Sequence, residues 1–475
     1  MKKFKTIVIS ILMVFSLIFS SSVQIMAAGK TAIGLENNTP NGTSDAKAFV
    51  DGIKDKVSSY SVTYKSPSSV KESDFYSKSK CIKYWSSHGS NTGRVWGTDS
   101  NVDLNIFDKS FSWAGGNLEF AFLAACRQLD GSNKNPRKRY AKAMIGGKAV
   151  RVICGYHEQA PSKIDKKVAD KFIAYAKTGE SVKSSWILAN KYWEYKGYST
   201  GVYCVLTHSG NVQYSRFPGF PGKTYTRPGA SSKTILRFSK ANPNGTTQKY
   251  STSNDLEKTK TIEASNVPDY VLRPSAIKLN VDNDTDMAVI RENTSVSLIG
   301  DEIGDTELEN SSNQAVDLCK QELNQSISNY SNIDLTQAKI SVEPIVMAKV
   351  DLDGNSDSEK ETTVAYDVTI KNTYNGIEIQ GDYLSGIVND QSALYLSGNW
   401  NDMEKVKADS KKKVIDYTTA KNSVHAFSKS SLVKGDLKFV FNADTGYYEP
   451  SWVFVSDEDE LTYSVNCFDG GISVE

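Results

Sequence analysis

The chain has 475 residues, of which 39% are hydrophobic, 10% aromatic and 23% charged. These values are typical of globular proteins and exclude an intrinsically disordered chain, a collagen and a simple coiled coil. At about 100–200 residues per domain, the length predicts two or three domains.

Residues 1–28 have the pattern of a secretory signal peptide. A start with three lysines precedes an apolar run from Ile7 to Phe19, and the small residues Ala27 and Ala28 follow it. The run is too short for a good membrane span, and no later stretch reaches about 18 apolar residues. We therefore expect a secreted protein, extracellular or associated with the cell wall, without stable membrane insertion.

The net charge of +1 conceals two oppositely charged halves. Residues 29–240 contain 33 Lys and Arg against 16 Asp and Glu, a net of +17, whereas residues 241–475 contain 20 against 39, a net of −19. A basic half alone would suit nucleic acid or an anionic wall, but a tethered acidic half is present at high effective concentration. We therefore expect intramolecular docking of the two halves, and no nucleic acid as a partner.

Short apolar runs alternate with helical patterns over residues 31–208. Strands are predicted at 31–35, 60–64, 82–87, 118–125, 149–155 and 202–206. Helices are predicted after Ser44, from Pro136, from a capping box of Ser162 and Asp165 to Gly179, and over 181–195. This alternation predicts an α/β fold for residues 29–217, with three layers and a mostly parallel sheet.

The pattern changes in the remainder of the chain. Residues 218–265 begin with closely spaced prolines and glycines, which indicates a loop or linker. In residues 266–475, helices are predicted at 311–328 and 418–427, and strands at 364–370, 377–388, 393–397, 437–441, 450–455 and 461–466. Because turns separate these strands, we expect an α+β domain with antiparallel strands.

Two predicted strands end in residues that can carry nucleophilic catalysis. The run 82–87 leads into His88 and Gly89, and the run 118–125 leads into Cys126. In a parallel sheet both strands deliver their carboxyl ends to one edge, where an imidazole and a following helix N-terminus would raise the thiolate fraction. His88 would act as general base or as ion-pair partner of the thiolate, and would then protonate the leaving amine. The backbone N–H groups of Gly89 and Cys126 would form an oxyanion hole.

These motifs resemble the clan CD cysteine peptidases, which include caspases, legumains, gingipains and clostripains. The triplet Ala125–Arg127 matches part of the caspase signature Gln-Ala-Cys-Arg-Gly, whereas Ala124 and Gln128 depart from it, so caspase specificity is not carried over. The stretch Trp113–Ala189 is also similar to a bacterial domain family of unknown function. The resemblance implies a caspase-like fold, a protein or peptide substrate and a His-Cys dyad that requires no cofactor.

Structural roles compete with these assignments. A cysteine that ends a buried strand is often only a small apolar residue, which is our interpretation of Cys81, Cys154 and Cys204. For Cys126, a structural thiol and a disulfide are alternatives to the nucleophile, since six cysteines permit up to three disulfides. The rival function is a non-catalytic caspase-like binding or immunity module at the cell surface.

Other polar residues near the predicted strand ends have two interpretations each. His157 and His208 are pocket-wall or loop residues, or second bases. Glu119 is a weak candidate for orienting the dyad. The basic run Lys134–Arg139 is a solvated helix start, or a docking surface for the acidic half.

The acidic half resembles the propeptide-type modules of secreted bacterial peptidases, including PepSY and the thermolysin propeptide. Segments 374–379, 394–400, 450–454 and 463–466 carry the resemblance. Such modules commonly inhibit or chaperone their enzymes, so we expect residues 266–475 to restrain access to Cys126. The alternative is an accessory domain that binds substrate or cell wall.

Two acidic loops place carboxylates at alternate positions, as calcium loops do. One spans residues 282–286, and the other supplies Asp351, Asp353 and Asp357 as the calcium candidates. Neither completes an EF-hand, and a solvated hairpin loop is the alternative for the second.

Overall fold

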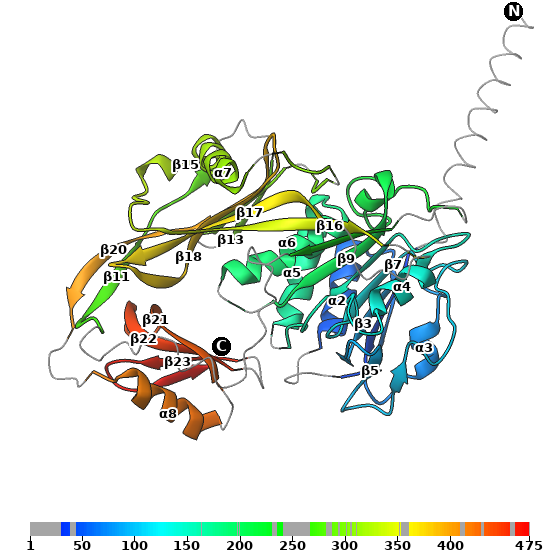
Figure 1. The fold of residues 1–475 in the computed structure, drawn as a ribbon, viewed down its shortest axis with the longest axis horizontal. Coiled ribbons are helices and arrows are strands. Elements are labelled where there is room, and N and C mark those ends of the chain that lie inside the picture. The colour runs from blue at the N-terminus through cyan, green and yellow to red at the C-terminus, as the bar shows by residue number, and fades with distance from the viewer. Residues whose placement is uncertain are drawn as a thin grey trace, which may run out of the picture.

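The protein is described from a computed structural model (Figure 1). The described residues are 30–38, 44–162, 164–196, 198, 200–229, 235–240, 267–281, 287–292, 295–300, 302–304, 306–309, 311–350, 352, 361–408, 414–428, 432–456 and 461–474. The predicted signal peptide and the calcium candidates Asp351, Asp353 and Asp357 lie outside these ranges. Within the part of the chain that the structure describes, no helix combines the length and the hydrophobicity needed to cross a membrane.

The first half of the chain builds a mixed α/β unit. Its main strands are β1 (Thr31–Glu36), β2 (Ser61–Lys65), β3 (Ile82–Ser86), β7 (Phe120–Ala124), β8 (Val152–Tyr156) and β9 (Tyr203–His208). A small separate sheet contains β4 (His88–Gly89), β5 (Arg94–Trp96) and β6 (Asp103–Asn105). The helices are α2 (Asp45–Lys56), α3 (Glu72–Tyr76), α4 (Pro136–Met144), α5 (Asp165–Thr178), α6 (Val182–Tyr195) and the 3-10 helix η2 (Gly210–Tyr214).

The main sheet is rich in parallel pairs, as predicted. β2 and β3 flank β1, β7 follows β3, and β8 follows β7, all in parallel. β9 reverses this direction, because it pairs with β8 antiparallel. The carboxyl end of β9 therefore lies at the opposite edge of the sheet from the carboxyl ends of β3 and β7.

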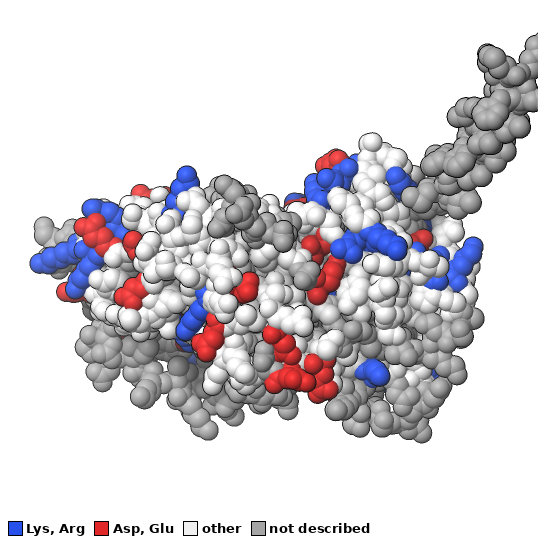
Figure 2. Space-filling view, turned by 90° about the horizontal axis from the view of Figure 1, so that it is seen from above, with Lys and Arg blue, Asp and Glu red and all other residues white. Residues whose placement is uncertain are grey.

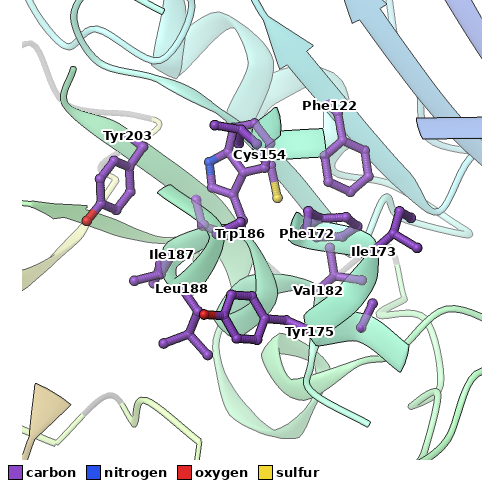
Figure 3. Close-up of a cluster of buried hydrophobic side chains, with 14 of the residues drawn as sticks. Phe122, Cys154, Phe172, Ile173, Tyr175, Val182, Trp186, Ile187, Leu188 and Tyr203 are labelled. Atoms are coloured by element: carbon purple, nitrogen blue, oxygen red, sulfur yellow. The ribbon is translucent and has the colours of Figure 1, made fainter. Parts of the chain in front are cut away.

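Hydrophobic cores lie on both faces of this sheet. Phe122 of β7 packs with Phe172 of α5 and Trp186 of α6, as Figure 3 shows. Leu123, the next residue of β7, belongs to a second cluster that contains Tyr140 of α4. Because successive side chains of a strand point to opposite faces, a continuously apolar strand is covered by helices on both sides.

Helix boundaries follow local signals at most ends, but one predicted cap is wrong. Ser44 caps α2 by accepting a hydrogen bond from the Lys47 N–H at 3.0 Å. α5 begins at Asp165 itself, with Ile164 as N-cap and no side-chain capping bond, so the predicted Ser162–Asp165 capping box is wrong. Asp165 is the first helical residue rather than the third, which leaves the box two positions out of register.

One strand lies inside the predicted linker. β10 (Ile235–Lys240) pairs antiparallel with β9 on one side and with β16 (Lys339–Lys349) on the other. One sheet therefore continues from the first half of the chain into the second. The expected loop or linker at 218–265 is wrong for this segment, since the surrounding prolines and glycines masked a short apolar run.

The second half is α+β with mostly antiparallel strands, as predicted. Its early elements are β11 (Tyr270–Ala276), β12 (Asn280–Val281), β13 (Ala288–Glu292), β14 (Ser295–Ile299), α7 (Ser312–Ser326), β15 (Ile327–Ser328) and η5 (Tyr330–Asn332). After β16 come β17 (Glu361–Tyr374), β18 (Ile377–Val388), β19 (Ala393–Asn399), β20 (Asn401–Lys407), α8 (Tyr417–Ser428), β21 (Leu432–Asn442), β22 (Tyr447–Ser456), β23 (Thr462–Asn466) and β24 (Ile472–Val474). α7 packs its apolar side against β17, β18 and β19.

Side chains of the two halves also meet directly. Lys191 of α6 is fully buried and pairs with Asp367 of β17, whose other oxygen accepts a hydrogen bond from the Tyr195 hydroxyl at 2.5 Å. Arg216 and Glu302 form a second ion pair at 2.8 Å. On the face shown in Figure 2, basic and acidic side chains appear on both halves. That the acidic half restrains access to Cys126 stays a prediction.

Candidate functional site

The parallel register brings His88 and Cys126 to one edge of the sheet. Ser86, the last residue of β3, pairs with Ala124, the last residue of β7, and each candidate follows its strand by two residues. The two segments stay hydrogen-bonded at the ends of the strands, because the Ser87 N–H donates to the Ala124 carbonyl at 3.1 Å. The structure thus places both residues where the sequence analysis expected them, while their catalytic roles stay predictions.

The hairpin of β4 and β5 sets the orientation of the Gly89 backbone. His88 pairs with Trp96, Gly89 pairs with Val95, and the Ser90 N–H donates to the Arg94 carbonyl at 3.0 Å. Hydrogen-bonded and non-hydrogen-bonded pairs alternate in an antiparallel ladder, so Gly89 occupies a non-hydrogen-bonded pair. Its N–H therefore points away from β5, as an oxyanion donor requires.

Gly89 packs directly against the backbone of Cys126. A Cβ atom at Gly89 would lie 2.3 Å from the Cys126 carbonyl oxygen and 3.2 Å from the Ala125 Cβ. Contacts shorter than 3.0 Å essentially never occur for real Cβ atoms. Only glycine allows the two strand ends to approach this closely.

His88 is half-buried beside an aromatic ring. Its imidazole stacks on Trp96, with ring centroids 5.5 Å apart and planes at 28°. Burial lowers the pKa of His88, and the charge of Asp99 opposes this effect. A lowered pKa keeps the imidazole neutral at neutral pH, the form that accepts a proton from a thiol.

Cys126 occupies a turn rather than the start of a helix. Residues 126–129 form the turn, and the next helix, α4, begins only at Pro136. The expected helix N-terminus beside the thiol is therefore wrong. A backbone donor is present instead, because the Ala160 N–H donates to the Cys126 Sγ at 3.3 Å. A hydrogen bond to sulfur favours the thiolate over the thiol.

The turn after Cys126 is fastened to the loop that follows β8. Arg127 has a φ of +58°, in the left-handed region that residues other than glycine rarely adopt. Its N–H donates to the Glu158 carbonyl at 2.7 Å, and the Leu129 N–H donates to the Tyr156 carbonyl at 2.9 Å. These bonds hold a backbone conformation that costs of order 1 kcal/mol and directs the chain sharply away from the strand.

The remaining cysteines are structural. Cys81, Cys154 and Cys204 are buried thiols rather than disulfides, and so are the two cysteines of the second half. Burial raises the pKa of Cys81 and of Cys154, which keeps them protonated and unreactive. Cys126 differs from all of these because it is partly exposed.

The two other candidate histidines, His157 and His208, lie in different places. His157 follows β8, with Nδ1 3.4 Å from the Leu129 carbonyl and 4.0 Å from Asp130, so it forms part of the wall beside the Cys126 turn. His208 is buried at the end of β9, with Nε2 3.1 Å from the Val150 carbonyl. Because β9 runs antiparallel, His208 lies at the opposite edge of the sheet.

Neither Glu119 nor the basic run contributes to this edge. Glu119 precedes β7 and forms an ion pair with Arg151, at the amino end of the strand. Arg139 donates hydrogen bonds to the carbonyls of Ile106, Lys109 and Phe111. Arg139, the last residue of the basic run, therefore stabilises a neighbouring loop. This role is neither of the two that were predicted for the run, a solvated helix start and a docking surface.

Two buried carboxylic acids near the site were not found from the sequence. Glu36 ends β1 and pairs in register with Ser86, and Asp45 begins α2. The Ser44 hydroxyl donates to Glu36, and the Tyr84 hydroxyl donates to Asp45 at 2.9 Å. Burial, together with the charge of the neighbouring Asp45, raises the pKa of Glu36. The sequence signal that could have indicated this pair is Glu36, an acidic residue at the end of an apolar strand.

Gln128 is a second residue that the sequence analysis did not place in the site. It is fully buried, and its side-chain amide lies within hydrogen-bond distance of carbonyls on both strand ends. In the sequence, Gln128 is visible only as a departure from the caspase signature. In the described part of the chain, no group of three or more His, Cys, Asp or Glu side chains is arranged to hold a metal ion.

Comparisons with known proteins give a family match and matches to solved structures. Residues 29–236 match the family described as "Domain of unknown function (DUF6345)". No curated protein matches the chain. A solved structure, the crystal structure of the Arg-specific cysteine proteinase gingipain R, is similar to 80% of this chain at 11% identity with a TM-score of 0.27. The match spans 66% of the gingipain chain, which is just under two thirds, and a likeness this weak carries no argument about chemistry.

Proposed function

We propose that the protein is a cysteine endopeptidase that uses Cys126 as nucleophile and His88 as general base and acid. The observation that supports this most is the close packing of Gly89 against the Cys126 backbone, because His88 directly precedes Gly89 in β4. The partly exposed thiol with a backbone N–H donor at 3.3 Å supports it independently. We propose a secreted location and a protein or peptide substrate on the sequence alone.

The proposed reaction passes through an acyl-enzyme. His88 accepts the thiol proton, and the Cys126 sulfur attacks the peptide carbonyl carbon. The N–H groups of Gly89 and Cys126 donate to the oxyanion of the tetrahedral intermediate. His88 then gives its proton to the departing amine as the C–N bond breaks. Water, deprotonated by His88, hydrolyses the thioester and restores the thiol and the neutral imidazole.

The pH dependence of thiol alkylation tests this proposal without knowledge of the substrate. The full chain is treated with iodoacetamide from about pH 5 to about pH 8, and each cysteine is quantified by mass spectrometry. Cys126 is expected to react faster than the buried Cys81 and Cys154, and the His88→Ala variant is expected to lose the reaction below neutral pH. The comparison with His88→Ala is necessary, because exposure alone accelerates alkylation.

Slow labelling of Cys126 with no dependence on His88 would contradict the dyad. It would favour the rival interpretation, a non-catalytic binding module. Selective labelling that disappears in His88→Ala would exclude a purely structural thiol.

A further inference from the structure

One buried side chain, that of Gln128, connects the strand end that carries His88 with the strand end that carries Cys126. The Gln128 Nε2 lies 3.3 Å from the Ser90 carbonyl, 3.4 Å from the Arg94 carbonyl and 3.3 Å from the Cys126 carbonyl. Ser90 and Arg94 close the hairpin that carries His88 and Gly89, whereas Cys126 belongs to the other strand end. A single amide therefore donates to both backbones at once.

The orientation of this amide is fixed from its other side. The Gln128 Oε1 accepts a hydrogen bond from the Tyr140 hydroxyl at 2.8 Å. Tyr140 lies on α4, is fully buried, and packs among Trp113, Phe111 and Phe75. Because the three neighbouring carbonyls can only accept hydrogen bonds, the amide nitrogen must face them and the oxygen must face Tyr140.

We propose that Gln128 is a positioning residue that sets the distance between His88 and Cys126. This inference rests on the proposed function. The amide donates to the Cys126 carbonyl and adds a donor to the Ser90 and Arg94 carbonyls, which also accept backbone N–H groups at 3.0 Å within the hairpin, so its loss would remove the side-chain link between the two strand ends. The amide also explains part of the requirement for Gly89, since a Cβ there would lie 2.7 Å from the Gln128 Nε2.

The central variant is Gln128→Met, which keeps the length of the side chain and removes both donors. We expect its Cys126 alkylation near pH 6.5 to fall about tenfold or more, toward the His88→Ala profile, since a misplacement of about 1 Å costs about a hundredfold in rate. Where a cleavable peptide has been found, kcat is expected to fall with little change in KM. A loss of stability alone would not move the pH profile of the folded protein.

Two further variants keep this test decisive. Tyr140→Phe leaves Gln128 in place but removes the anchor of its amide, so we expect a smaller shift in the same direction. It decides the question if Gln128→Met fails to fold. Gln213→Met is the matched control, because Gln213 is equally buried and accepts a hydrogen bond from Lys183 at 2.9 Å, outside the site. The control is expected to lose stability and keep the wild-type alkylation profile.

The outcomes separate this inference from the proposed function. If His88→Ala leaves the alkylation profile of Cys126 unchanged, the dyad fails and Gln128 has nothing to position. If His88→Ala changes the profile but folded Gln128→Met, or Tyr140→Phe in its place, matches the wild type, the role of Gln128 is overturned while the proposed function stands.

Discussion

Gly89→Ala is the smallest change that should disable the candidate site. The added methyl group would lie 2.3 Å from the Cys126 carbonyl oxygen, where ordinary contacts start at 3.4 Å. The hairpin and the Cys126 turn must therefore separate by about 1 Å. A displacement of that size is expected to lower kcat about a hundredfold. The overpacking itself is expected to cost about 1–3 kcal/mol of folding free energy.

The assay pairs activity with stability. Cys126 alkylation and peptide hydrolysis are measured on folded Gly89→Ala, and urea unfolding gives the change in the free energy of unfolding. Gly147→Ala is the matched control, because a Cβ at Gly147 would meet nothing within 4 Å. Wild-type alkylation and turnover in Gly89→Ala would refute the argument that close backbone packing builds the site.

Three further outcomes follow from charge and burial. Because burial lowers the pKa of His88, kcat/KM should fall on the acid side with a midpoint below the ordinary value of 6.5, and a midpoint above it would contradict a neutral general base. The pKa of Glu36 is raised above its unfolded value of 4.5, so the folded state binds more protons and the free energy of unfolding should fall as pH rises from there. Urea titrations should show a flatter dependence in Glu36→Gln, and an unchanged slope would argue against the buried acid pair. Asp367→Ala should cost about 3–5 kcal/mol in unfolding, since it leaves the buried Lys191 without its closest counter-charge. The double variant Lys191→Met, Asp367→Leu should lose less, and equal losses would contradict a coupled buried pair.

The sequence predicted the strands of the site better than their surroundings. β3 and β7 are buried on both faces, so they appear as continuous apolar runs whose ends are easily located. His88 and Cys126 could be placed at one edge because the alternation of strands and helices over residues 31–208 predicted a mostly parallel sheet. The direction of β9 could not be predicted in this way, since an apolar run carries no information on strand direction, and His208 was therefore left as a second candidate.

Contacts over long sequence separations were beyond the sequence patterns. Gln128 meets carbonyls 34 and 38 residues away, and only the folded register shows that its amide lies between the strand ends. The turn at Arg127 with positive φ was hidden for a similar reason, because arginine gives no signal for that conformation. β10 was missed because local composition indicated a linker, whereas its two neighbouring strands determine its conformation.

The central claim is that Cys126 and His88 hydrolyse peptide bonds. The most direct measurement is digestion of a defined peptide library by the full chain, with Cys126→Ala and His88→Ala analysed in parallel by mass spectrometry. We predict cleavages by the wild type that disappear in both variants while both remain folded. Cleavage that persists in Cys126→Ala would contradict the assignment, and so would a wild-type chain with a reactive Cys126 that cleaves no peptide.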